Sequence, residues 1–509
     1  MGKNNITKNI FVVVGVSVLT KLLGLIKQII ISNYFGMTGE TDAFLLVSGT
    51  INDIGTALFS ALAIVYLADY IKIKERKIEQ LHVFSTNVAT VFLIIALIIC
   101  VVVEVFAIQI VGIIAPGFSK EALLQARDYL RILAPMFVVL CARTIANSIL
   151  DAEGKFWYGK SLGTIQSLCL IGATILLSKK YGVVTLVYAL VITYIIELAL
   201  GFWTVCRNGY YKISYSGKIL TTEVKGMISC MVPLFISNSI LDINALVARG
   251  ASSMLGEGVV SALSYAQTLK QFVNTILITS TLTVLYTNLV KKVTGKDDKI
   301  NSFVLKSISI YLIILLPICL VTIFCAEDIV CIVYGRGAVT EEAVKITAQA
   351  LRGYGFGFIP VALNGILLRT YYSFSETRYT MLCSVWSVIV NSVIAIFGAK
   401  YVGIIGITLA ASISSLCSFV FLALGAKKRV GKINWNSLKV LVIKMLIAAC
   451  ITAIIAYKVN DNVTVLNQWW NVLIQTGIIG GSFYLSLAVM RCKELKYLTS
   501  VFKNFLCKG

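Results

Sequence analysis

Two lysines interrupt the first apolar segment of the chain. Lys21 and Lys27 are six residues apart, an angular offset of about 120° on an α-helix, so both side chains can line one broad face. A charged side chain in hydrocarbon costs at least about 2.5 kcal/mol, so such residues normally face a polar cavity or a partner. Two cations facing a water-filled cavity would attract a phosphate and hold it by charge-assisted hydrogen bonds. The pair therefore predicts a binding site for an anionic headgroup.

Further polar and ionisable side chains recur inside later apolar segments. The candidates for the same binding site are Asp42 and Asn52 in the second segment, Arg143 in the fourth, Asp242 and Arg249 in the seventh, and Lys270 in the eighth. The aspartates would keep an empty cavity from carrying an uncompensated positive charge. A structural alternative pairs Asp242 with Arg249, seven residues apart on one helix face, and lets the lysines snorkel to a membrane interface.

The sequence carries no pattern typical of a metal or cofactor site. Its 13 cysteines include no CxxC pair, and His82 is the only histidine. Cysteine in an apolar segment behaves as a small hydrophobe. We therefore expect no metal and no cofactor, and no catalytic residues.

The elements that must position these side chains are membrane helices. Hydrophobic residues make up 58% of the 509 residues and charged residues 14%, whereas a soluble domain needs far more charge to cover its surface. Many apolar stretches are long enough to cross about 30 Å of hydrocarbon. We predict an all-α polytopic membrane protein of about 14 transmembrane helices. The expected spans are 9–34, 41–70, 83–113, 122–151, 157–178, 182–205, 226–249, 257–290, 303–333, 341–372, 379–399, 402–426, 438–458 and 468–490.

The net charge of +21 is concentrated in short connections between these spans. Every second connection is basic, and so is the tail after residue 490, with Lys179–Lys180 as the main exception. This alternation follows the positive-inside rule and requires an even number of helices, with both termini in the cytoplasm. A nucleic-acid surface would be a continuous basic patch with interleaved aromatics. We therefore expect the partner to be a lipid bilayer and not nucleic acid.

A short internal repeat divides the chain. Glu121-Ala122 and Leu130-Arg131 match Glu342-Ala343 and Leu351-Arg352 at one offset of 221 residues. We predict two related six-helix lobes, 1–225 and 226–432, followed by two helices and a basic tail in 433–509. Parallel repeats of this kind place a substrate cavity between the halves.

The chain also resembles a known family. Thr20–Lys27, Tyr34–Gly36 and Thr41–Phe44 are similar to the opening of the MurJ (MviN) lipid II flippases, which belong to the multidrug/oligosaccharidyl-lipid/polysaccharide exporter superfamily. The similarity continues in the same order along nearly the whole chain, through Ala115–Phe118, Ser264–Ala266, Tyr334–Ala338 and Leu367–Ser373.

The resemblance implies a fourteen-helix fold with a central cationic cavity. It implies alternating access that moves an undecaprenyl-pyrophosphate-linked peptidoglycan precursor from the inner to the outer leaflet, with the last two helices forming a groove for the lipid tail. Lys21 and Lys27 stand where the family usually has arginines, so they keep the charge but lose the bidentate fork. Asp42 and Asn52 match the family's pattern.

Three departures from that pattern bear on the substrate. Gly55 and Thr268 stand where the family usually has cavity arginines, and the proline that normally follows Glu376–Arg378 is missing. Lys270, two positions after Thr268, would compensate for the lost charge from a different direction.

We therefore expect a flippase of the bacterial cytoplasmic membrane that carries a polyprenyl-pyrophosphate-linked glycan, with lipid II as the leading candidate. The nearest alternative is an exopolysaccharide-repeat flippase of the same superfamily. A drug or cation exporter would need an acidic, aromatic cavity. A polyprenyl-glycan polymerase or ligase would need an outer loop with acid and base residues, whereas the outer loops here are short.

Overall fold

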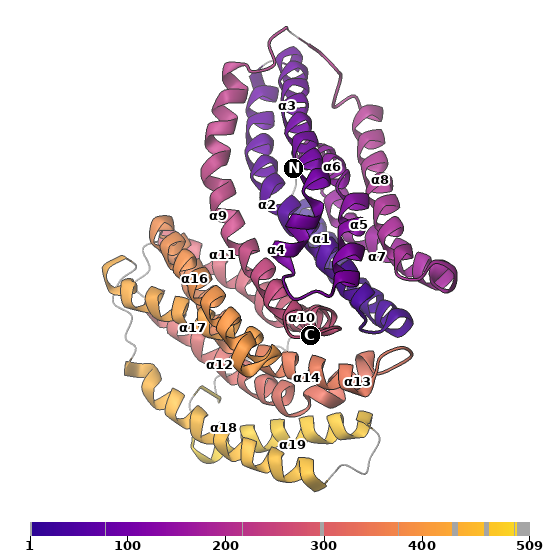
Figure 1. Ribbon diagram of the computed structural model, residues 1–509. Helices are drawn as coiled ribbons and strands as arrows, with labels where there is room; N and C mark the ends of the chain where they lie inside the picture. The colour runs from indigo at the N-terminus through magenta and orange to yellow at the C-terminus, as the bar shows by residue number, and fades with distance from the viewer. Residues whose placement is uncertain are drawn as a thin grey trace. The chain divides into compact units, whose positions relative to one another are not determined.

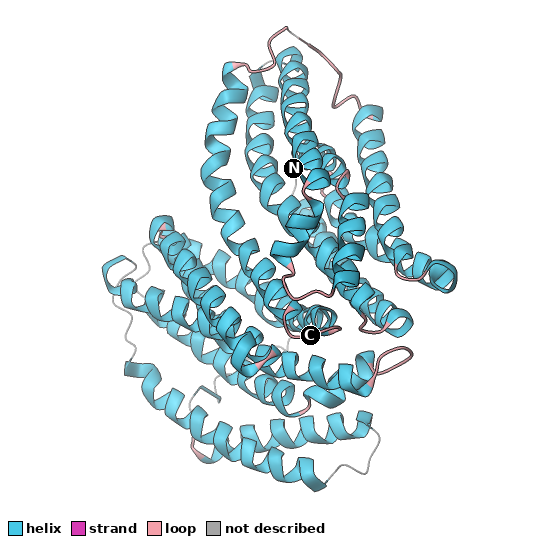
Figure 2. Ribbon diagram, viewed as in Figure 1, coloured by secondary structure: helices cyan, strands magenta, loops and turns pink. Residues whose placement is uncertain are grey.

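The computed structural model describes residues 3–76, 78–215, 217–295, 300–374, 376–429, 436–462, 468–492 and 494–495. Every regular element within these ranges is helical, in nineteen α-helices and one short π-helical turn (Figure 2). The expected all-α class is confirmed. Ten of the described helical segments are long and apolar enough to cross a membrane, and a bent pair brings the number to eleven. The total of about 14 spans stays a prediction.

Packing divides the chain into two compact units, Met1–Ser261 with Gly337–Val339, and Ala262–Arg336 with Thr340–Gly509. The lobe boundaries expected from the repeat stay a prediction. The helices of the first unit, indigo to magenta in Figure 1, are α1 (Lys3–Phe35), α2 (Gly39–Arg76), α3 (Ile78–Val105), α4 (Ala107–Ile114), α5 (Lys120–Leu133), α6 (Met136–Ala152), α7 (Trp157–Tyr181), α8 (Val184–Arg207) and α9 (Thr222–Ser253).

The second unit continues from α10 (Val259–Val273), whose first turn belongs to the first unit. Its remaining elements are η1 (Asn274–Thr279), α11 (Ser280–Thr294), α12 (Ile300–Phe324), α13 (Ala326–Tyr334), α14 (Glu341–Gly355), α15 (Phe358–Ser373), α16 (Thr377–Val402), α17 (Ile404–Arg429), α18 (Asn436–Asn462) and α19 (Gln468–Val489). The last two pack along each other, and α18 also packs against α12.

Several of the long expected spans consist of two consecutive helices. The span 122–151 breaks between α5 and α6, which are bent by 42° at Pro135, because proline lacks the N–H that would continue the helical hydrogen bonding. The span 341–372 breaks between α14 and α15 at Phe356–Gly357. A Cβ on Gly357 would lie 2.6 Å from Ser412 Oγ, so glycine permits the close approach of α17.

The structure shows matching local features at the repeat offset. The Ser119 hydroxyl caps α5 and the Thr340 hydroxyl caps α14, each by accepting the N–H three residues on, as an N-cap residue does. Gly182 and Gly403 end α7 and α16 with nearly the same backbone angles, φ 59°, ψ −148° and φ 75°, ψ −149°. Arg131 and Arg352, also 221 residues apart, each form an exposed ion pair, with Glu104 and Glu327 respectively; these two glutamates are not at the repeat offset.

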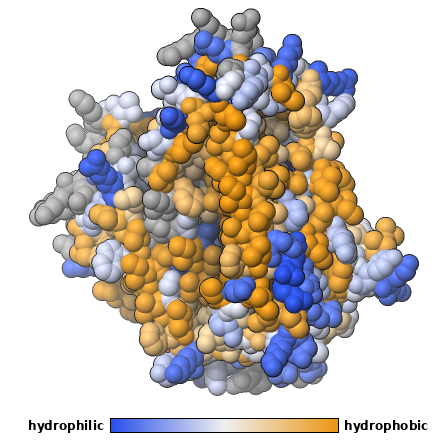
Figure 3. Space-filling model, turned by 45° about the horizontal axis from the view of Figure 1, so that its top comes forward, coloured by the Kyte–Doolittle hydropathy of each residue, from blue (hydrophilic) through white to orange (hydrophobic). Residues whose placement is uncertain are grey.

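The surface of the helices is suited to lipid. Large hydrophobic side chains are widely exposed, such as Leu97 and Ile98 on α3, Leu176 on α7 and Trp203 on α8. Much of the face in Figure 3 is accordingly hydrophobic. A soluble protein rarely exposes such large contiguous apolar areas, so these helices are membrane-embedded.

Candidate substrate-binding site

The two lysines of the first apolar segment lie on α1, which packs along α7. The hydroxyls of Thr20 and Thr164 are hydrogen-bonded at 2.8 Å across this contact. Gly163 allows the approach, because a Cβ there would lie 2.7 Å from Thr20 Cγ2. Lys21 is exposed and Lys27 is partly buried. Within the described residues neither ammonium group has an ion-pair or hydrogen-bond partner.

Arg249 on α9 forms a salt bridge with Asp53 on α2. Its Nη1 lies 2.6 Å from Asp53 Oδ2, and the two side chains are only 12% and 15% exposed. Gly49, one turn before Asp53, makes room, since a Cβ there would lie 2.6 Å from Arg249 Cζ. This corrects the alternative that pairs Arg249 with Asp242, which lies partly buried on the same helix.

Arg143 on α6 is also neutralised. Its Nη1 donates to the carboxylate of Glu197 on α8, which is 1% exposed, and its guanidinium lies 5.2 Å from the centre of the Tyr194 ring. A buried charge needs such a partner. Glu197 was not among the residues expected from the sequence, although a lone carboxylate within the span 182–205 was itself a signal.

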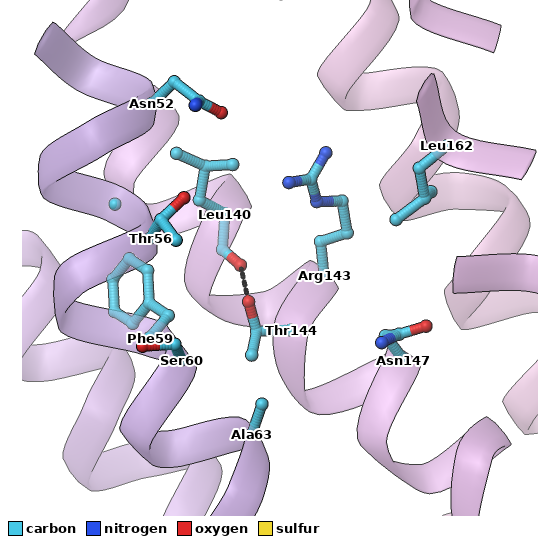
Figure 4. Close-up of a pocket in the computed structure, with 11 residues that line it drawn as sticks. Asn52, Thr56, Phe59, Ser60, Ala63, Leu140, Arg143, Thr144, Asn147 and Leu162 are labelled. Atoms are coloured by element: carbon cyan, nitrogen blue, oxygen red, sulfur yellow. Dashed lines mark hydrogen bonds between the residues drawn. The ribbon is translucent and has the colours of Figure 1, made fainter. Parts of the chain in front are cut away.

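The side chain of Arg143 points into a pocket between α2, α6 and α7 (Figure 4). The pocket has a volume of about 210 Å³ and lies wholly within the first unit. Asn52, expected as a binding residue, lines it, as does Gly55. The structure thus brings Asn52 and Arg143 together at one cavity.

Asp42, near the start of α2, has a different environment. Its buried carboxylate accepts the backbone N–H of Gly258 and of Ser261, both at 2.7 Å, and also the Ser261 hydroxyl. Gly258 directly precedes α10, and Ser261 lies in its first turn. The Asp42 carboxylate, which belongs to α2, therefore caps the N-terminus of α10. In this conformation both of its oxygens hold the start of α10.

The second unit holds one expected site residue and a large apolar cavity. Lys270, in the last turn of α10, has its Nζ 4.1 Å from the centre of the Tyr354 ring, a cation–π contact. The cavity has a volume of about 570 Å³ and is lined by residues of α12, α15, α17 and α18, among them Leu312, Leu363 and Leu446. In the described part of the chain no cluster of His, Cys, Asp and Glu side chains could hold a metal ion.

The helices are membrane-embedded, and a polar pocket lies within the helix bundle of the first unit. In the part of the chain that the structure describes, Lys21 and Lys27 of α1 have no partner. These features together define a class, that of multi-pass membrane transporters. A search of solved structures finds a lipid II flippase MurJ in an inward closed conformation, with a TM-score of 0.81 and 22% identity over 94% of this chain and 98% of that one. An inward-facing multidrug resistance MATE family transporter of the MOP superfamily matches at a TM-score of 0.71 and 15% identity, over 82% and 96%.

Sequence comparison gives the family. The profile described as "Lipid II flippase MurJ" matches residues 31–474. A probable lipid II flippase MurJ from Buchnera aphidicola (subsp. Baizongia pistaciae) is 25% identical, covering 82% of this chain and 83% of its own. The lipid II flippase MurJ from Burkholderia cenocepacia is 22% identical, covering 84% of each. The chain belongs to the lipid II flippase MurJ family, and is therefore a transporter and not an enzyme.

Proposed function

We propose that this protein flips lipid II, a polyprenyl-pyrophosphate-linked glycan, across the bacterial cytoplasmic membrane by alternating access, with both termini in the cytoplasm. The observation that carries the proposal is the pair of cations on α1, Lys21 and Lys27, for which no partner exists among the described residues. A positive side chain within a membrane helix is costly unless water or a ligand compensates it. A pyrophosphate supplies that compensation at the point where the lipid headgroup must cross.

The remaining cations have a secondary part in this proposal. Arg249 and Arg143 are already neutralised by Asp53 and Glu197, and Lys270 is stacked on Tyr354. A phosphate would gain less from a neutralised arginine than from a free lysine, because the partner carboxylate repels it. We therefore assign first contact with the pyrophosphate to Lys21 and Lys27.

The apolar cavity of the second unit supports a lipid-linked substrate. Its lining is almost entirely hydrophobic and includes residues of α18, one of the two C-terminal helices. The lipid tails of the bilayer and the lining of this cavity are similarly apolar, so a polyprenyl tail can exchange one for the other at little cost in free energy. We propose that the polyprenyl tail lies there while the headgroup crosses, as the family resemblance implies.

Complementation tests the proposal. The intact gene should restore growth to a bacterial strain depleted of its own lipid II flippase. The Lys21→Ala/Lys27→Ala double variant should fail, because no cation on α1 remains to bind pyrophosphate, whereas the Lys21→Arg/Lys27→Arg variant should succeed because it keeps both charges. Membrane levels of every variant are measured by immunoblotting.

The same experiment separates the proposal from its nearest rival. An intact protein that reaches the membrane but does not restore growth would move the assignment to an exopolysaccharide-repeat flippase. The relatives named above favour lipid II, because both are named lipid II flippases.

A further inference from the structure

The pocket beside Arg143 has a polar wall and an apolar wall. Asn52, Thr56 and Ser60 follow one another at four-residue intervals along α2, so their side chains form a polar stripe on one helix face. The side chains of Asn52 and Thr56 are exposed to the pocket, and no described residue hydrogen-bonds them. Leu140 and Leu162 contribute apolar surface from α6 and α7.

Gly55 keeps this pocket open. It lies between the polar residues of α2, and a Cβ there would already approach Leu140 Cδ1 to 2.9 Å. A larger side chain would crowd the pocket lining at Leu140, which Figure 4 shows beside Thr56 and Arg143. The lack of a side chain at position 55 therefore helps to keep space beside Leu140 in the pocket.

The described lining of the pocket carries no net charge. Among these described residues Arg143 is the only charged one, and the buried carboxylate of Glu197 balances it. A phosphate entering here would meet Glu197 as a like charge in a medium of low dielectric. The guanidinium has five N–H donors, so donors remain for an uncharged acceptor. The pocket thus suits a neutral polar group and not an anion.

We propose that this pocket, lined by Asn52, Gly55, Thr56 and Arg143, binds a neutral sugar ring of the substrate headgroup. The inference rests on the proposed function, since it names the part of the lipid-linked glycan that this site takes. A sugar ring offers hydroxyl groups to the amide, hydroxyl and guanidinium of the polar wall, and its C–H faces to the apolar wall. The volume of about 210 Å³ is below the roughly 300 Å³ of a complete small-ligand pocket, so it accepts one portion of the headgroup.

Binding to two lipid probes tests the assignment in the purified full-length protein. One probe is undecaprenyl pyrophosphate, and the other is the same lipid bearing the disaccharide without its peptide. Gly55→Leu fills the pocket and should weaken binding of the glycan lipid at least about tenfold, while binding of the bare lipid changes less than about twofold. Thr56→Val, which is isosteric and cannot disturb the fold by its size, should weaken binding of the glycan lipid about three- to tenfold.

Two further variants serve as controls for these binding measurements. Gly172→Leu makes the same exchange on α7 at a position with no atom within 4 Å of a new Cβ, and should leave both affinities unchanged. Lys21→Ala should weaken both probes together, because the pyrophosphate is common to them.

Any of the following outcomes would overturn the assignment of this pocket to a sugar ring. Equal losses for both probes in Gly55→Leu and Thr56→Val would mean that the pocket contacts the pyrophosphate, and unchanged affinities would mean that it binds no part of the headgroup. A wild-type protein that binds both probes equally would refute the sugar site but leave the proposed function standing. A wild-type protein that binds neither probe would refute both.

Discussion

At the scale of the residue, ion pairing decides which cations can meet a substrate. The positive side chains could be located from the sequence, but their partners could not, because Asp53 and Arg249 are 196 residues apart and Arg143 and Glu197 are 54 apart. Only the packing of α2 on α9 and of α6 on α8 brings these pairs together. Lys21 and Lys27 could be predicted as candidates, but the sequence could not show that they have no partner among the described residues.

The packing of Gly49 against Arg249 leads to a stability prediction. Gly49→Ala places a methyl group 2.6 Å from Arg249 Cζ, so the flexible guanidinium must move away from Asp53. The variant should lose about 1–3 kcal/mol of unfolding free energy, because a largely buried charge is left with weakened pairing. Denaturant unfolding in detergent measures this, with Gly172→Ala, where nothing lies within 4 Å, as the matched control.

A double-mutant cycle identifies the cause. In an Arg249→Gln background, Gly49→Ala should lower the free energy of unfolding by less than it does in the wild type. The coupling energy between the two substitutions should be at least about 0.5 kcal/mol. Strictly additive losses would show that Gly49 acts by some route other than the salt bridge.

At the scale of the element, hydropathy predicted the apolar segments well and their internal breaks poorly. The expected spans 41–70 and 468–490 each correspond to one continuous helix, α2 and α19. Spans such as 303–333 are divided, here into α12 and α13, because a break in the backbone does not interrupt the run of apolar residues. Local residues such as Pro135 mark some breaks, whereas others depend on how neighbouring helices pack.

The contact of α2 with the start of α10 carries an element-scale prediction. Asp42→Ala removes the acceptor of the Gly258 and Ser261 N–H groups, so the first turn of α10 should open more readily. Each buried donor left unsatisfied costs about 1–3 kcal/mol. Hydrogen exchange of the amides of 258–261 should accelerate, and Asp42→Asn, which keeps one acceptor oxygen, should accelerate it less. Equal protection in Asp42→Ala and the wild type would rule out the capping role.

At the scale of the whole molecule, composition and loop charge are enough to predict the class of protein. The hydrophobic content and the alternation of basic connections describe a polytopic membrane protein. The lobe boundaries rest on a short repeat and stay a prediction. Packing groups α9 with the helices of the first unit, but a repeat records ancestry and not contact, so the two divisions of the chain describe different properties.

The most direct test of the central claim is the amount of lipid II exposed on the outer leaflet of cells depleted of their own flippase. Cells that express the wild type or Lys21→Arg/Lys27→Arg should expose lipid II at normal levels. Cells that express Lys21→Ala/Lys27→Ala at the same membrane level should retain it on the inner leaflet. Normal exposure in the alanine variant would contradict the account, because the pyrophosphate would then cross without the cations of α1.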